Sequence, residues 1–177
     1  MKYSVIINGA AGVGKDTFVE LCNEPAQRRG LTLNNFSSVD KLKEDLFSED
    51  EPYNRSPEHR QMLVDAKERL MHDGPEYFAR NMGSQVLRLS PPDSVSFLHI
   101  REPEQITLTL KYFAATYPGV NTSTLLVVRD GLIVPNNKAD TRVADYTGYN
   151  WTVHNNASIE DLALEAEEFI DKLADSN

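Results

Sequence analysis

Short apolar segments alternate with polar, helix-forming stretches along the whole chain. The apolar segments lie at residues 3–8, 31–36, 94–100, 124–129 and 151–154. This alternation predicts parallel βαβ units, and therefore an α/β fold with a three-layer, doubly wound sheet of five parallel strands. The segment 124–129 is nearly all apolar, which favours a strand buried on both faces.

The helical stretches follow from apolar spacing and from helix-ending residues. The predicted helices cover residues 15–23, 40–47, 57–73, 78–87, 103–116 and 158–173. Pro25 is expected to end the first helix, and Pro57 to open the third because proline is tolerated at a first helical position. In the third helix, Met62, Leu63, Ala66 and Leu70 form an apolar stripe at helical spacing.

Residues 39–90 contain helices and polar loops but no good strand signal. An insertion of this size between the second and third strands predicts a helical subdomain, and we expect it to hold an acceptor substrate. At 177 residues the chain is long enough for one core, so we expect a single domain, 1–177, that carries this insertion.

A glycine-rich run follows the first strand directly and leads into the first helix. Gly9, four residues, Gly14 and Lys15 match the phosphate-loop spacing. Small residues let backbone N–H groups point into one concavity, and the start of the helix adds a positive dipole end. The sequence therefore predicts a polyphosphate site, made by Gly9, Ala11, Gly12, Val13, Gly14, Lys15, Asp16 and Thr17.

The end of this loop carries the candidate chemistry. Lys15 is expected to contact the transferred phosphates of ATP. Asp16 stands where a Ser or Thr hydroxyl would normally contact Mg²⁺, and Thr17 follows it. Both offer hard oxygen ligands for magnesium, directly or through water. An alternative for Asp16 is a helix-start residue favoured by the helix dipole.

Charge and composition exclude several partner classes. A net charge of −9 disfavours nucleic acid as a general partner, because a phosphate-backbone binder needs a basic face. No stretch of the sequence approaches the ~18 consecutive apolar residues of a membrane span. We also expect no secretory leader, because no charged segment followed by an apolar one precedes the first strand. The lone Cys22 suits a reducing compartment. We therefore expect a cytoplasmic protein without a membrane or nucleic-acid partner.

Residues 130–148 form a polar, glycine- and proline-containing segment with few apolar anchors, and this composition predicts a lid carrying Arg142. Ser158 and Asp161 then form a variant of the capping box at the start of the last helix. The pattern gives no prediction of oligomeric state.

Three further segments extend the loop pattern into a family resemblance. The chain resembles the P-loop nucleoside monophosphate kinases, in the branch whose loop ends in Gly-Lys-Asp, which includes phage deoxynucleoside monophosphate kinases and animal-type phosphomevalonate kinases. The matching segments are Val39–Glu44, Arg101–Gln105 and Tyr149–Leu162. The resemblance implies a P-loop kinase fold, ATP and Mg²⁺ as cofactors, and a small phosphate acceptor, foremost a nucleoside monophosphate.

Carried over by position, the resemblance also implies roles for basic residues. Lys43 and Arg101 would face the acceptor phosphate. Arg142 would close on the ATP phosphates, with Arg129 as a second candidate there, and the inserted helices offer Arg60 and Arg80 for the acceptor. The alternative for each is a solvated surface charge.

One position departs from the family. His99 stands where the family has an acidic residue at the end of the third strand. Glu102 or Glu104 would then substitute for the missing carboxylate, or Asp16 would carry the metal alone. The departure keeps two alternatives open beside a monophosphate kinase: a kinase of another small phosphorylated metabolite, and a nucleotide-binding regulator that turns over poorly.

Overall fold

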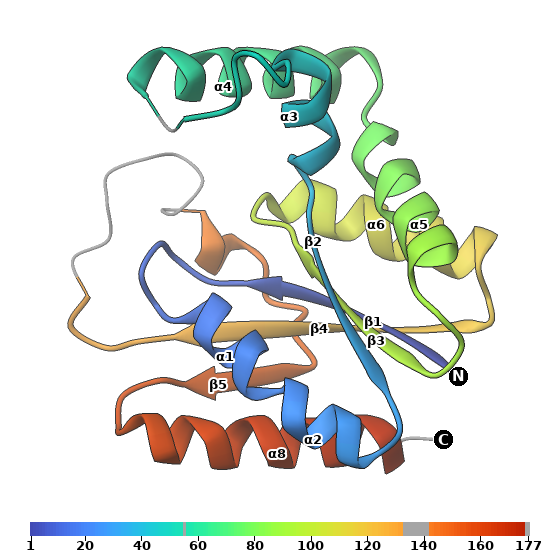
Figure 1. The fold of residues 1–177 in the computed structure, drawn as a ribbon, viewed down its shortest axis with the longest axis vertical. Coiled ribbons are helices and arrows are strands. Elements are labelled where there is room, and N and C mark those ends of the chain that lie inside the picture. Colours follow the sequence, from blue (N-terminus) through green and yellow to red (C-terminus); the bar gives the residue numbers. More distant parts are fainter. Residues whose placement is uncertain (55, 133–141, 176–177) are drawn as a thin grey trace.

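A computed structural model describes residues 1–54, 56–132 and 142–175, and its strands form one parallel sheet of five (Figure 1). The strands are β1 (Lys2–Asn8), β2 (Thr32–Ser37), β3 (Ser94–His99), β4 (Val120–Val128) and β5 (Trp151–His154). Their order across the sheet is β2-β3-β1-β4-β5. This arrangement confirms the doubly wound parallel fold, and it brings the carboxyl ends of all five strands to the same edge.

Helices cover both faces of the sheet (Figure 1). α1 (Lys15–Leu21), α2 (Asn23–Arg28) and α8 (Ile159–Asp175) pack on one face, and α5 (Tyr77–Leu89) and α6 (Pro103–Thr116) pack on the other. α3 (Asp40–Leu46) and α4 (Pro57–Asp73) lie together beyond the carboxyl edge of the sheet, and a short 3₁₀ helix, η1 (Val143–Asp145), precedes β5.

The first helix ends at Leu21, and the prediction that Pro25 ends it is wrong. Pro25 lies in the first turn of α2, where its missing N–H is not needed. Its side chain is buried, and the amide of Ala26 still donates to the carbonyl of Cys22 at 3.0 Å. Two short helices therefore replace one, and both pack against α8.

β4 begins four residues earlier than the apolar run predicts. Val120, Asn121, Thr122 and Ser123 pair in register with β1 from Lys2 onward. Polar side chains hide this part of the strand in the sequence pattern, because a central strand is expected to be apolar throughout. The pairing extends the contact between β1 and β4 along the whole length of β1.

Two predicted helix starts are confirmed by their hydrogen bonds. At α8, the Asp161 amide donates to Ser158 Oγ at 3.1 Å and the Ser158 amide donates to Asp161 Oδ2 at 3.1 Å, a reciprocal cap. At α4, Ser56 Oγ accepts from the His59 amide at 3.2 Å, with Pro57 in the first turn.

The predicted lid is described in part. Residues 133–141 lie outside the described residues, while Arg142 and η1 are placed beside α6. Among the described residues, no helix is long and apolar enough to cross a lipid bilayer.

Aromatic rings fill the core between the sheet and α8. Phe169 meets Phe18 with ring centroids 5.8 Å apart, Phe97 at 6.1 Å and Trp151 at 5.8 Å. Its side chain is 3% exposed. The Phe169 ring of α8 thus packs against rings from α1, β3 and β5, and it holds these three elements together.

Phe169→Ala should lower the free energy of unfolding by about 3–5 kcal/mol, because it removes a ring enclosed by other rings. Leu164→Ala on the same helix is the matched control, since Leu164 is 64% exposed, and its loss should be near zero. Urea unfolding followed by circular dichroism measures both. Equal losses in the two variants would contradict this account of the core.

Candidate functional site

The glycine-rich loop between β1 and α1 has the backbone conformation that its glycines allow. Gly9, Gly12 and Gly14 have φ of 146°, 80° and 95°, a region that side chains rarely tolerate. A Cβ on Gly9 would lie 2.4 Å from the Val127 carbonyl oxygen, and one on Gly14 would lie 2.4 Å from Asn155 Nδ2. The loop is therefore packed tightly against β4 and against the turn after β5.

Lys15, the first residue of α1, is held against this loop. Its side chain is buried, and Nζ donates to the carbonyl oxygens of Gly9 at 2.5 Å and Ala10 at 2.8 Å. Lys15 also lines the large cleft of the molecule. The ammonium group thus lies where the loop meets the cleft.

Asp16 and Thr17 follow Lys15 on the cleft wall. The Asp16 carboxylate is 88% exposed and lies 4.0 Å from His99 Nδ1 at the end of β3. Among the described residues there is no group of three or more His, Cys, Asp or Glu side chains that would hold a metal ion by itself. Asp16 and Thr17 nevertheless supply the oxygen donors that Mg²⁺ prefers, and Mg²⁺ in such sites takes its remaining ligands from phosphates and water.

His99 is largely buried between the sheet and α1. Burial lowers the pKa of its imidazole, and the nearby charges of Lys15 and Arg101 lower it further, against the opposing effect of Asp16. The imidazole is therefore neutral at pH 7, and its contact with Asp16 is not an ion pair. Its Nε2 atom is buried and has no hydrogen-bond partner.

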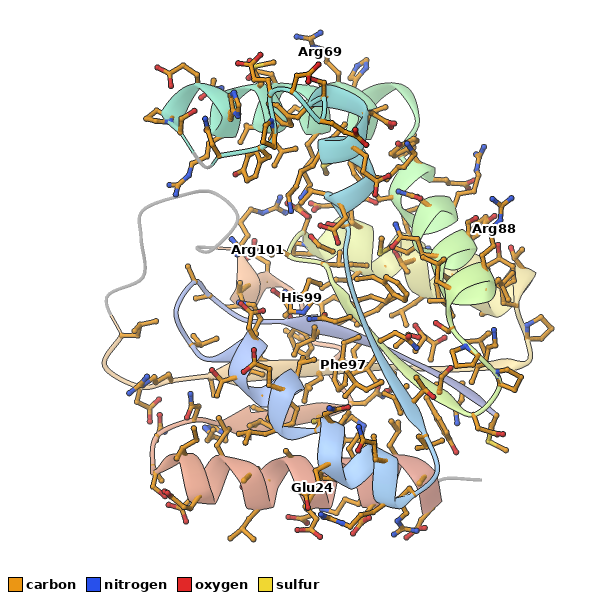
Figure 2. The ribbon with its side chains drawn as sticks, in the orientation of Figure 1. Glu24, Arg69, Arg88, Phe97, His99 and Arg101 are labelled. Atoms are coloured by element: carbon orange, nitrogen blue, oxygen red, sulfur yellow. The ribbon has the colours of Figure 1, made fainter. Side chains whose placement is uncertain are left out.

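A cleft of about 1380 Å³ joins the phosphate loop to the α3–α4 pair. Figure 2 shows His99 at the end of β3, with Arg101 beyond it on the side of α3 and α4. One face of α4 lines the cleft through Arg60, Leu63, Val64, Lys67, Glu68 and Met71. No apolar side chain of α4 is buried among its described residues, so part of the predicted apolar stripe faces the cleft instead of a core.

Three of the predicted acceptor cations lie on the cleft wall, namely Lys43, Arg60 and Arg101. Lys43 Nζ is 3.0 Å from Asp40 Oδ1 and 5.6 Å from the centre of the Tyr53 ring. Arg80 and Arg129 are exposed, and neither lines the cleft. The structure therefore brings Lys43, Arg60 and Arg101 to the cleft and leaves the other two outside it.

Arg142 lines the cleft, but acidic side chains hold its guanidinium. Nη2 is 2.5 Å from Glu104 Oε1, and Nε is 3.1 Å from Asp145 Oδ2. These contacts raise the pKa of Arg142, and the Arg142 hydrogen bond lowers the pKa of Glu104. Contact of Arg142 with phosphates requires exchange of these carboxylates.

Glu102 and Glu104 are both paired with basic side chains. Glu102 Oε1 accepts from Lys67 Nζ at 2.6 Å, and the two side chains are 16% and 17% exposed. Glu104 pairs with Arg142. Each carboxylate therefore compensates a cation in this structure.

Lys67 and Tyr53 are among the residues of the cleft that sequence reasoning missed. Lys67 lies seven residues after Arg60, and this spacing on a predicted helix would have placed both on one face. Tyr53 belongs to an aromatic cluster with Phe47 and His59, in which ring centroids are 4.5–6.3 Å apart. The loop around Tyr53 has no periodic pattern, so the sequence carries no comparable signal for it.

No family model and no curated protein matches this chain. Solved structures do match. The APS kinase CysC of Mycobacterium tuberculosis, in complex with AMPPNP and APS, is 15% identical with a TM-score of 0.55, over 97% of each chain. A mutant of the same enzyme gives 17% identity and a TM-score of 0.55, over 97% of this chain and 96% of that one.

A further match is APE1195, which is 10% identical with a TM-score of 0.53, over 97% of this chain and 96% of that one. At these identities the similarity concerns the fold. The chain thus has a five-stranded parallel P-loop fold that a known kinase shares over nearly its full length.

Proposed function

We propose that this protein transfers the γ-phosphoryl group of ATP to a nucleoside or deoxynucleoside monophosphate. The observation that carries the proposal is one continuous cleft that runs from the phosphate loop to a wall containing cations, aromatic rings and apolar side chains. A phosphoryl-transfer enzyme needs both substrates in one space, with their phosphates aligned and their charge compensated.

The donor half of the cleft is the phosphate loop. Its backbone would cradle the ATP phosphates, with Lys15 compensating their charge. Asp16 and Thr17 are the residues that would hold Mg²⁺, which would neutralise charge on the β- and γ-phosphates when bound. Thus Lys15 and Asp16 carry the proposed chemistry from the donor side.

The acceptor half is formed by α3, α4 and the segment after β3. Lys43, Arg60 and Arg101 supply positive charge for an acceptor phosphate. Tyr53 contributes an aromatic ring to the wall, and Leu63, Val64 and Met71 of α4 contribute apolar surface. A flat base joined to a phosphate matches this combination better than a small aliphatic phosphate does, because stacking needs a ring.

Catalysis in this proposal is positioning and charge compensation. An acceptor phosphate is already a nucleophile, so no side chain has to remove a proton from it. Arg101 would orient the attacking phosphate, and Arg142 would stabilise charge on the transferred group after leaving Glu104 and Asp145. Residues 39–90 would act as the acceptor-binding insertion and 130–148 as the lid of a single cytoplasmic kinase domain.

His99 favours a second candidate function, a nucleotide-binding regulator with slow turnover. A neutral imidazole stands at the strand end where the related kinases carry a carboxylate. Such a protein would keep ATP binding and lose acceptor-dependent turnover. A kinase of another small phosphorylated metabolite uses the same cleft and is distinguished by the acceptor alone.

With ATP and Mg²⁺, ADP release should be stimulated by a nucleoside monophosphate in a panel that also contains phosphorylated sugars and phosphomevalonate. Lys15→Ala should lower kcat/KM by about a hundredfold or more, because it removes charge compensation at the transferred phosphate. Lys172→Ala, an exposed lysine on α8, is the matched control and should keep full activity.

ATP binding without stimulation by any acceptor would favour the regulator. Stimulation by phosphomevalonate or a sugar phosphate alone would favour the metabolite kinase. Wild-type activity equal to that of Lys15→Ala with every acceptor would overturn the proposed transfer.

Tyr53→Ala should raise the KM for the monophosphate about tenfold, because stacking on one aromatic ring contributes about 1–3 kcal/mol. Tyr53→Phe keeps the ring and should stay close to wild type. The KM for ATP should be unchanged in both variants, since Tyr53 lies on the acceptor side. Equal acceptor KM values for the alanine and phenylalanine variants would contradict a stacking role.

A further inference from the structure

Asn155, in the turn after β5, connects that turn to the phosphate loop. Its backbone amide donates to the Val128 carbonyl at 2.8 Å, which anchors the turn to the end of β4. Its side-chain Nδ2 donates to the Val13 carbonyl at 2.8 Å. The two loops are far apart in sequence, and this amide group joins them directly. Asn155 does not line the cleft, so any effect on the ligand must act through the loop.

The bond to Val13 sets the direction of one peptide group. In a trans peptide the carbonyl oxygen and the amide hydrogen point in opposite directions. Fixing the Val13 carbonyl toward Asn155 therefore turns the Gly14 N–H away from Asn155. Gly14 lines the cleft, and an N–H turned toward that side is available to a phosphate oxygen.

Gly14 makes this constraint necessary. At φ of 95° it has no side chain to oppose rotation of the neighbouring peptide, and glycine adopts many backbone conformations at low cost. A Cβ at this position would lie 2.4 Å from Asn155 Nδ2, so the loop and the asparagine are in close contact. Because residue 14 has no side chain to limit rotation of the Val13–Gly14 peptide, the hydrogen bond from the Asn155 amide supplies that restraint.

We propose that Asn155 is a positioning residue that holds the phosphate loop in its anion-binding conformation by orienting the Val13–Gly14 peptide. This inference rests on the proposed function of the loop as the ATP phosphate site. Asn156, the next residue, has a different role, because its Nδ2 donates to Asp130 Oδ2 and its Oδ1 accepts from the Asp130 amide, both at 2.7 Å. The two asparagines thus differ in whether their side chains reach the phosphate loop.

The test measures binding of ATP and of inorganic tripolyphosphate, each with Mg²⁺, by titration calorimetry. Asn155→Ala should weaken both ligands by about three- to tenfold, the range expected for loss of one hydrogen bond. Tripolyphosphate has no base, so an equal loss for both ligands assigns the effect to the phosphate loop. Asn156→Ala is the matched control from the same turn and should bind both ligands like wild type.

Two readouts separate positioning from a general structural effect. The KM for ATP should rise in Asn155→Ala while the KM for the acceptor stays constant, because the acceptor half of the cleft does not contact this turn. Asn155→Asp keeps the size of the side chain but places an oxygen against the Val13 carbonyl, so it should weaken tripolyphosphate at least as much. If Asn155→Ala does not fold, the affinity of Asn155→Asp for tripolyphosphate is compared with that of the wild-type protein.

Wild-type tripolyphosphate affinity in a folded Asn155 variant would overturn this inference and leave the proposed kinase function intact. The inference would also be overturned if Asn156→Ala lost as much affinity as Asn155→Ala. Absence of ATP and tripolyphosphate binding by the wild-type protein would overturn both proposals.

Discussion

The close approach of the phosphate loop to the end of β4 is the constraint on which the site depends. Any Cβ on Gly9 would collide with the Val127 carbonyl oxygen, so the chain can leave β1 in this direction only with glycine there. That exit fixes where α1 begins, and therefore where Lys15 and Asp16 lie relative to His99 of β3. The same strand end anchors the turn that carries Asn155. The phosphate loop, the start of α1 and the turn after β5 are thus all positioned by the end of β4.

Basic side chains gather in the cleft of a protein that is acidic overall, and carboxylates compensate several of them. The chain carries a net charge of −9, yet Lys43, Lys67 and Arg142 all face the cleft. Each is paired with a carboxylate in this structure. The partly buried Lys67–Glu102 pair compensates charges that would otherwise be costly to desolvate. Exposed pairs such as Arg142–Glu104 contribute little stability and are exchanged easily.

The sequence predicted those features that depend on local pattern. The phosphate loop, the five parallel strands and the capping box at Ser158 are each encoded within a few consecutive residues. The break at Cys22 was not predictable, because Pro25 is compatible both with ending a helix and with opening one. The polar start of β4 was missed for a related reason, since its pairing with β1 is a tertiary contact.

The candidate site was predictable to the extent that its residues adjoin strand ends. Lys15, Asp16 and Arg101 follow β1 or β3 closely, so the fold alone brings them to one edge. Tyr53 and Asn155 reach their positions through loop geometry, which short-range patterns do not specify. Arg80 and Arg129 were expected at the site on resemblance, and the helix and strand end that carry them turn them outward.

The position of α4 has a consequence for how this protein can diversify. Its described apolar side chains are not part of the core, which is built from the sheet, α1, α2, α5, α6 and α8. Substitutions on the cleft face of α4 therefore change the wall of the cleft at small cost to folding. Substitutions of the phosphate-loop glycines Gly9 and Gly14 are less well tolerated, because neighbouring atoms fill the space that a side chain would need. Under the proposed function, selection can thus replace the acceptor while the phosphate loop stays constant.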